Sequence, residues 1–540
     1  MEPTLIFING NIITMKEGLK AEALAVEGDR ITALGSRDEI MELANVMTRV
    51  IDLEGRTLMP GLIDTHVHVV GYGFSFEAID LLGIPSLEKL VEKCERHIRE
   101  NEIPDGTWIL GRGFDHNRFE DTKRFPNSSD LNRISEKHPI LLLRTCGHIG
   151  IANDLALQFA GVDGNTYVRG GSFDKHEDGS PNGVIKEASL EWFKEKMSQS
   201  RNVDDLKRAI MIGGRDLSRF GITSVHTEDS YDLGYAGDLE DLYEAYRQLI
   251  IEGNLYQRVY QKISLPRIEN VRNFLKKDLK SGDGNDYFRI GPVKLWADGT
   301  LGGRTAWLIE DYDDASGQKG ISVYDDDEMV EIIDLCQKNN LQMCIHSIGD
   351  AALEQILDAY EKTGSSLEAD NRHRIVHCQI GNHKQYERIG RLGLNINIQP
   401  LHTRTDFPLI EYRLGKDRTS KCHAWKSLKE EGVVITGSSD VPCTNDRNAA
   451  SVFQGISAIV NRDYWLKEEE VSVYDALEMY TTNAAYSAFE EDTKGTIEEG
   501  KLADLIILSD DPLSIDKTRI KDINVEMTFL GGRLIYGGMK

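Results

Sequence analysis

The sequence has too few basic residues to balance its acidic ones. Its 540 residues include 63 Lys and Arg against 89 Asp and Glu, which gives a net charge of -26. Nucleic acids and anionic membranes recruit clusters of Lys and Arg. The imbalance therefore argues against a nucleic-acid partner and against a membrane-surface partner.

Three further absences narrow the class of protein. No apolar run approaches the roughly 20 residues of a membrane span, and the start of the chain lacks the basic segment and long apolar core of a signal peptide. We therefore expect a soluble, cytoplasmic protein. The seven cysteines are odd in number and form no CxxC pair, which favours reduced thiols over a disulfide framework. No internal repeat or low-complexity tract is visible.

Both ends of the chain are rich in short β-prone runs divided by turn dipeptides such as Asn9-Gly10 and Gly531-Gly532. Neither end has enough strands to close a core by itself. We therefore expect residues 1–57 and 491–540 to meet in one small β-sandwich domain.

The middle of the chain alternates strand-like runs with helix-like stretches, and the run near residues 58–68 brings the strands to eight. Eight β-then-α units predict an α/β fold, a (β/α)8 barrel of the TIM type, whose chemistry lies at the carboxyl ends of the strands. We expect residues 58–71 and 209–490 to form it. Residues 72–208 are too long for a usual connection, so we expect an inserted α/β cap over the barrel mouth.

Two histidines separated by one residue, His66 and His68, end the first strand-like run, in the segment LMPGLIDTHVHVVG. Residues two apart on a strand face the same way, so both imidazoles can hold one divalent metal ion. A solvated strand face explains an isolated pair equally well. The metal interpretation gains from the polar residues that end later strands, which are His226, Lys294, Asp298, His346, His377 and Asp440.

Five segments in this order, PGLIDTHVH, VKLWADGTLGGRTA, MCIHSIGD, RIVHCQIG and TGSSDVP, resemble the amidohydrolase superfamily, and specifically its YtcJ-like branch, amidohydrolase family 3. The likeness covers essentially the whole chain. It implies a metal-dependent hydrolase acting on C–N bonds other than peptide bonds, and N-substituted formamide deformylases are among the few characterised members. It does not transfer a substrate.

The resemblance also implies residue roles. His66 and His68 correspond to the pair that binds one metal, and Asp440 to the acid that contacts the same metal and takes the proton from its water. His346 and His377 correspond to histidines that hold a second metal where two are present, and we count His377 with Asp440 as catalytic. The expected cofactor is a divalent metal, zinc before others, as one or two ions.

Lys294 stands where members with a bridging ligand carry a carboxylated lysine. An unmodified lysine is a cation and a poor ligand, so Lys294 fits a metal site only if it is carbamylated or deprotonated. As an ammonium it would instead hold a substrate oxygen. The sequence cannot show the modification.

Zinc lowers the pKa of a bound water to about 7, and a nearby carboxylate can take the proton and return it to a leaving amine. We expect Asp440 in that role, although an Asp here could also cap the loop after Ser438-Ser439.

Four further residues are candidates for substrate contact. Asp115 and His148, in the insert, resemble family positions that face the substrate, although each also suits a loop hydrogen bond beside its neighbouring glycine. Arg304 could anchor an anionic group through its planar guanidinium, or serve as a structural ion-pair partner. His226 is either a core histidine or a group behind the metal ligands.

Several neighbours of these positions have plainer interpretations. Asp298 and Asp350 each lie four residues beyond a predicted ligand and are expected to orient it. We interpret Cys344, Cys378 and Cys443 as small apolar fillers, because no Cys/His spacing marks a nucleophile.

The resulting hypothesis is metal-dependent hydrolysis of an amide-type or formamide-type C–N bond in a small-molecule substrate. The nearest rival is a deaminase or an ester or lactone hydrolase using the same site. A barrel that has lost catalysis and serves in regulation is a rival of another class, but it has no chemical need for ligand types at all six positions. Barrel enzymes often form symmetric homo-oligomers, and nothing in the sequence fixes a subunit number.

Overall fold

The structure is a computed structural model that describes residues 2–538, except 123, 145–148, 169–170, 199–200, 230–238, 421, 444–447 and 463–464. The chain divides into two compact units. One contains Met1–Val69, Gly214–Asp229 and Tyr246–Lys540, and the other contains Val70–Gly213 and Ser230–Ala245. The first unit holds both a sandwich and a barrel, so the predicted division into three domains stays a prediction.

An eight-stranded sheet is the centre of the first unit. Its strands pair in the order β20-β19-β18-β17-β16-β15-β14-β7, and every pairing is parallel. The predicted (β/α)8 barrel is confirmed. The strands are β7 (Leu62–Val67), β14 (Ile222–Thr227), β15 (Arg258–Ser264), β16 (Phe288–Trp296), β17 (Met343–Ser347), β18 (Arg374–His377), β19 (Asn395–Ile398) and β20 (Ile435–Gly437).

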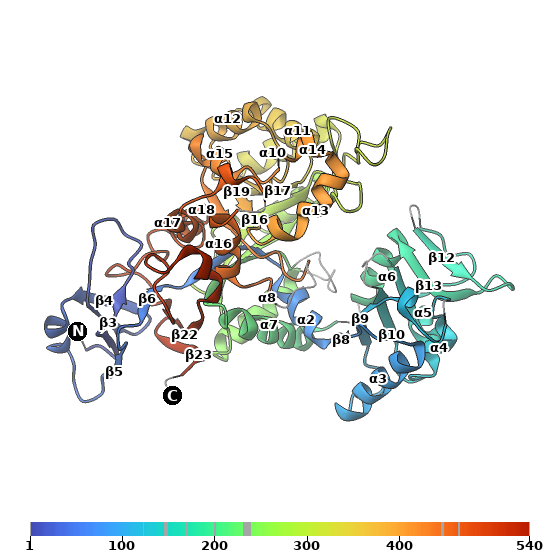
Figure 1. Cartoon of the computed structure of the whole chain (residues 1–540), viewed down its shortest axis with the longest axis horizontal. Coiled ribbons are helices and arrows are strands. Elements are labelled where there is room, and N and C mark those ends of the chain that lie inside the picture. Colours follow the sequence, from blue (N-terminus) through green and yellow to red (C-terminus); the bar gives the residue numbers. More distant parts are fainter. Residues whose placement is uncertain are drawn as a thin grey trace. The chain divides into compact units, whose positions relative to one another are not determined.

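Helices follow the barrel strands and explain why the strands carry no alternating pattern. Every residue of β7, β14, β17, β18, β19 and β20 is buried, as expected for parallel strands covered by helices outside and packed side chains inside. Figure 1 shows α10, α11, α12 and α15 together beside β17 and β19. The helices are α8 (Leu239–Ile251), α9 (Ile268–Leu275), α10 (Asp326–Lys338), α11 (Asp350–Lys362), α12 (His383–Leu392), α13 (His402–Leu414), α14 (Lys416–Thr419), α15 (Trp425–Glu430), α16 (Val452–Val460), α17 (Val473–Glu478) and α18 (Thr482–Ser487).

The barrel closes where its first strand, β7, meets the segment of β20. The backbone N–H of Asp440 donates to the carbonyl of His66 at 2.9 Å, and the N–H of His68 donates to Val441 at 3.0 Å. The Thr65 hydroxyl donates to the carbonyl of Gly437 at 2.9 Å. These bonds bring Asp440 beside a residue 372 positions earlier in the chain.

The two ends of the chain form two sheets, ordered β4-β3-β1-β5 and β2-β6-β21-β22-β23. β6 pairs antiparallel with β21, so N-terminal and C-terminal strands share one sheet, and the rings of Phe7 and Phe529 meet edge to face at 5.2 Å. The elements are β1 (Leu5–Ile8), β2 (Asn11–Ile12), β3 (Ala23–Glu27), β4 (Arg30–Gly35), α1 (Arg37–Met41), β5 (Arg49–Asp52), β6 (Thr57–Pro60), β21 (Leu505–Leu508), β22 (Val525–Leu530) and β23 (Arg533–Gly537).

The second unit is an α/β structure around a six-stranded sheet of order β12-β13-β11-β10-β9-β8. Phe114 and Phe119 are fully buried in its hydrophobic core. The strands are β8 (Ile79–Asp80), β9 (Ile109–Phe114), β10 (Ile140–Arg144), β11 (Ile149–Ala152), β12 (Gly171–Lys175) and β13 (Pro181–Glu187). The helices are α2 (Val69–Glu77), α3 (Leu87–Glu100), α4 (Ser128–Asn132), α5 (Asp154–Ala160), α6 (Ala188–Ser198) and α7 (Val203–Ser218).

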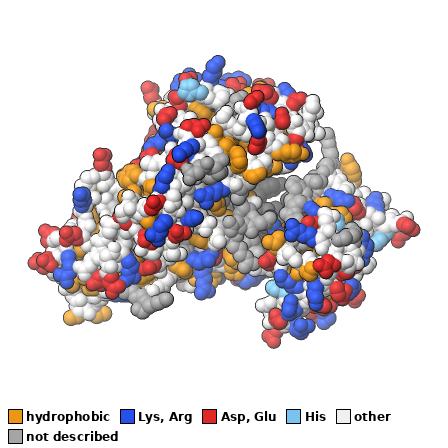
Figure 2. All heavy atoms as spheres, in the orientation of Figure 1, with side chains coloured by type: hydrophobic (Ala, Val, Ile, Leu, Met, Phe, Trp, Pro, Cys, Tyr) orange, Lys and Arg blue, Asp and Glu red, His pale blue; other side chains and the backbone are white. Residues whose placement is uncertain are grey.

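The helices and the surface charges both agree with the composition. Among the described helices, none is long and apolar enough to cross a membrane. Figure 2 shows acidic and basic side chains interspersed over the face in view.

Candidate metal centre

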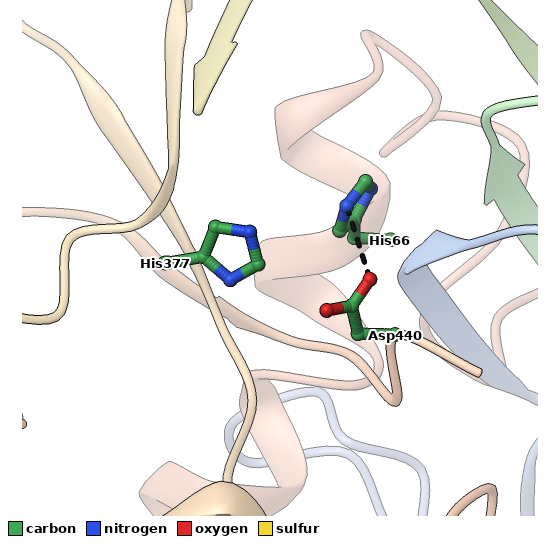
Figure 3. A group of neighbouring side chains, drawn as sticks. All are labelled: His66, His377 and Asp440. Carbon is green, nitrogen blue, oxygen red and sulfur yellow. Dashed lines mark ion pairs between the residues drawn. The ribbon is translucent and has the colours of Figure 1, made fainter. Parts of the chain in front are cut away.

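Four of the predicted ligands meet at the carboxyl ends of barrel strands. Nε2 of His68 lies 3.2 Å from Oδ1 of Asp440, and Nε2 of His66 lies 3.4 Å from the same oxygen. One ligand atom each of His66, His377 and Asp440 lies within 4.8 Å of the others, and Figure 3 shows these three side chains converging from separate segments. We call His66, His68, His377 and Asp440 the Asp440 group. All four are buried.

The second nitrogen of His68 and of His377 faces an oxygen acceptor. Nδ1 of His68 lies 2.9 Å from the backbone carbonyl of Glu228, which can only accept. Nδ1 of His377 lies 2.6 Å from Oε1 of Gln399, whose amide nitrogen donates to Ser438 at 3.0 Å. In both rings Nδ1 therefore carries the hydrogen, and Nε2 keeps the lone pair that a metal needs.

His66 has a different partner, Lys262 at the end of β15. The Nζ atom of Lys262 lies 2.5 Å from Nδ1 of His66 and donates to the carbonyl of Thr65 at 3.0 Å. Burial lowers the pKa of Lys262 to about 8. At neutral pH most of this amine is still protonated and donates to Nδ1. Only its neutral form can accept a hydrogen from Nδ1 and so leave Nε2 of His66 as the ligand atom.

Burial sets the charge of the group. Burial lowers the pKa of His66 and of His377 well below the ordinary value. Burial alone would raise the pKa of Asp440, but the adjacent His68 and His377 hold it well below its usual range. At neutral pH the rings of His66 and His377 are neutral and the carboxylate is ionised, which are the forms that bind metal.

These contacts fit a divalent cation. Two acceptors, Nε2 of His68 and Oδ1 of Asp440, face each other at 3.2 Å. Ligands held about 2.0–2.3 Å from one tetrahedral zinc lie roughly 3.3–3.8 Å apart. An ion between the acceptors would remove the repulsion of their lone pairs, so the donor set suits zinc.

His346 and Lys294 lie beside the Asp440 group. Nε2 of His346 lies 3.1 Å from the carbonyl of Gly299, which leaves Nδ1 with the lone pair, and its ring centre is 4.6 Å from that of His377. Lys294 is buried, and its Nζ lies 5.3 Å from the centre of the Trp296 ring. His346 does not belong to the sets of three ligand atoms around Asp440 among the described residues.

Asp298 takes a position suited to orienting His346. Its carboxylate accepts from the backbone N–H groups of Trp307, Ile348 and Gly349, and Oδ1 lies 3.5 Å from Nε2 of His346. The carboxylate of Asp350 instead accepts from the backbone N–H of Ile309 at 2.9 Å.

Each substrate-contact candidate that the structure describes has a polar partner within its own unit. Asp115 belongs to the second unit, where it accepts from Arg144 at 2.9 Å and from the N–H of Asn117. Arg304 makes an ion pair with Asp314 at 2.6 Å. His226 is fully buried and its Nδ1 accepts from Arg374 at 2.8 Å. His148 lies outside the described residues.

Sequence reasoning missed three supporting residues and misjudged one. Lys262 ends the third strand, as the predicted ligands end theirs, so the same criterion would have found it. Gln399 follows the seventh strand, and Asp64 accepts from the N–H groups of His66 and Ser439 at 3.1 Å; neither is marked by local sequence. The interpretation of Cys443 as an apolar filler is wrong, because this side chain is exposed, whereas Cys344 and Cys378 are buried.

The barrel and the residues at its strand ends together define the class of protein. The model of the amidohydrolase family matches residues 49–536, and the chain belongs to this family.

Particular relatives resemble the chain along nearly its whole length. YtcJ of Bacillus subtilis (strain 168), named as a candidate amidohydrolase, is 31% identical over 98% of this chain and 99% of its own. The N-substituted formamide deformylase of Arthrobacter pascens is 26% identical over 98% of each chain. A crystal structure of an uncharacterised metal-dependent hydrolase from Pyrococcus furiosus is 30% identical, with a TM-score of 0.79 over 94% of this chain and 100% of that one.

Proposed function

We propose that the protein is a metal-dependent hydrolase that cleaves an amide-type or formamide-type C–N bond of a small molecule. The observation that carries the proposal is the meeting of His66, His68 and Asp440, with imidazole and carboxylate acceptors 3.2–3.4 Å apart in a buried site. The name of the Arthrobacter pascens relative, an N-substituted formamide deformylase, supports the bond type.

His66, His68, His377 and Asp440 would hold the ion, and His346 and Lys294 would complete a second position. A divalent ion bound there supplies a water with a pKa near 7 and polarises the substrate carbonyl. Asp440, ionised at neutral pH, takes the proton of the attacking water. As the C–N bond breaks, the same carboxyl group returns that proton to the leaving nitrogen, so the products are a carboxylic acid and an amine.

Lys294 has two roles open within this proposal. As an ammonium it would hold a substrate oxygen by charge. As a carbamate it would be an anion that bridges two ions, and we propose this form because no hydrogen bond or ion pair to the buried Lys294 amine is made by the described residues. Intact-protein mass spectrometry under carbon dioxide would show an added 44 Da, and Lys294→Ala serves as the control.

The test combines metal analysis with a substrate panel. We expect the purified protein to contain zinc or another divalent transition metal, and to release amines from N-formyl amines. His66→Ala and Asp440→Asn should lose the activity. The control variants His383→Ala and Asp38→Asn each change an exposed side chain and should keep it. Protein without metal, with activity unchanged in His66→Ala and Asp440→Asn, would contradict the proposal.

The same panel separates the rivals. Aminated heterocycles, esters and lactones test the deaminase and ester-hydrolase alternatives, which use the same water. Release of ammonia from a heterocycle, with no cleavage of N-formyl amines, would replace the proposed bond type. Metal binding without turnover on any of these substrates would favour a regulatory barrel.

A further inference from the structure

A second set of ligand atoms shares Asp440 with the first. One ligand atom each of His68, Asp440 and Cys443 lies within 4.8 Å of the others. Five described cysteines, Cys94, Cys336, Cys344, Cys378 and Cys422, are buried, and Cys443 differs from them in being exposed. The thiol therefore lies on the solvent side of two buried metal-binding side chains.

The chain bends Cys443 back toward Asp440. Asp440 has a left-handed backbone, with φ of 57°, and the N–H of Cys443 donates to the carbonyl of Asp440 at 2.8 Å. The side chain three residues after the carboxylate is thus returned to the same site, where Nε2 of His68 and Oδ1 of Asp440 already face each other.

A separate observation concerns His377, another histidine of the Asp440 group. His377 is nine-tenths buried, and its Nδ1 is occupied by Gln399. Its Nε2 has no hydrogen-bond partner among the described residues, although the ring belongs to the set around Asp440 (Figure 3). A lone pair on this ring, within 4.8 Å of ligand atoms of His66 and Asp440, fits an ion held between them.

We propose that the thiolate of Cys443 coordinates the divalent ion held by His68 and Asp440. Zinc accepts a mixture of Cys, His and Asp ligands, with the sulfur about 2.3 Å away. A thiolate selects soft ions, so zinc, cobalt and cadmium would be preferred over magnesium, calcium and manganese. The inference rests on the metal centre of the proposed function and adds a ligand to it.

Cobalt reports the bond directly. Titrating Co²⁺ into the metal-stripped full-length protein should produce a near-ultraviolet thiolate-to-cobalt charge-transfer band. Cys443→Ser should abolish that band and weaken zinc binding by about tenfold or more. Cys94→Ala, which changes a buried cysteine of the second unit, should keep both. Cys443 is exposed, so the Ser variant should unfold at the wild-type temperature.

Alkylation gives an independent readout. Iodoacetamide should label Cys443 in the metal-stripped protein, and saturating zinc should protect it, as located by peptide mass spectrometry. A cobalt-loaded, active protein with no charge-transfer band and no protection of Cys443 would overturn this inference and leave the proposed function standing. Failure of the wild-type protein to bind zinc or cobalt would overturn both.

Discussion

Two buried sets of residues in the barrel treat histidine in opposite ways. In the Asp440 group, Nδ1 of His68 and of His377 face oxygens that only accept, so Nε2 keeps its lone pair. In the barrel-interior group, which we define as His226, Tyr260 and Arg374, Nδ1 of His226 accepts from the Arg374 guanidinium. His226 must then carry its hydrogen on Nε2 and cannot bind metal there.

We propose that this difference separates metal ligands from structural histidines. All of these rings are buried on barrel strands or directly after one, and burial lowers the pKa of His226 as it does that of His66 and His377. Burial and position therefore do not distinguish the two kinds. The partner of the second nitrogen does, because it decides which nitrogen offers a lone pair.

The largest expected effect follows from removing the carboxylate of the Asp440 group. Asp440→Asn should reduce kcat by about 10²–10⁴-fold, the usual contribution of a general acid or base, and should lower the zinc content. Steady-state kinetics and metal analysis check this, with Asp38→Asn as a control on an exposed Asp. A variant with wild-type kcat and full zinc would remove Asp440 from the chemistry.

The next effect tests whether the partner of Nδ1 decides that Nε2 is free to bind metal. Gln399→Met removes the acceptor from Nδ1 of His377, and we expect zinc to bind about 10–100-fold more weakly. Gln399→Glu keeps an acceptor oxygen and should stay close to wild type. Competition with a chromophoric chelator measures both affinities. Equal losses in the two variants would show that the acceptor is not what matters.

A substitution in the barrel-interior group should instead change the free energy of unfolding. His226→Leu leaves Nη1 of the buried Arg374 without its acceptor and should lower the free energy of unfolding by about 1–3 kcal/mol. Zinc affinity of the folded variant should change by less than about twofold, since His226 is not a ligand. Chemical denaturation and the same chelator competition check the pair of outcomes. A large loss of zinc affinity with unchanged stability would reverse the assignment.

A smaller, graded effect is expected from pH. Burial lowers the pKa of His373 to about 3, from 6.5, and its Nδ1 accepts from the N–H of Met343, as in His226. The unfolded chain takes up a proton below pH 6.5, whereas the folded one does not until about pH 3. Stability is therefore lost as pH falls through this window, by about 1.4 kcal/mol per pH unit for this residue.

Thermal unfolding of the metal-stripped protein between pH 7 and 4 would show that slope. His373→Asn, which has no titrating ring, should have a shallower slope than the wild type. Equal slopes in the two proteins would mean that His373 is not held neutral by its surroundings.

Much of the fold and the grouping of the candidate ligands could be predicted from the sequence. Eight strand-like runs and their polar ends predict the barrel and the positions of His66, His68, His377 and Asp440. The supporting contacts could not be predicted, because they join distant segments. Lys262 contacts His66 from 196 residues away, and the carbonyl of Glu228 contacts His68 from 160 residues away. Cys443 was misjudged because its exposure depends on a turn that the spacing of residues does not reveal.

The central claim is that His66 and His68 share one ion with Asp440. A crystal structure of the zinc-loaded protein, with anomalous data on both sides of the zinc edge, tests it most directly. We expect an anomalous peak about 2.0–2.2 Å from Nε2 of His66, Nε2 of His68 and a carboxylate oxygen of Asp440. A zinc-saturated crystal with no peak among these three side chains would contradict it.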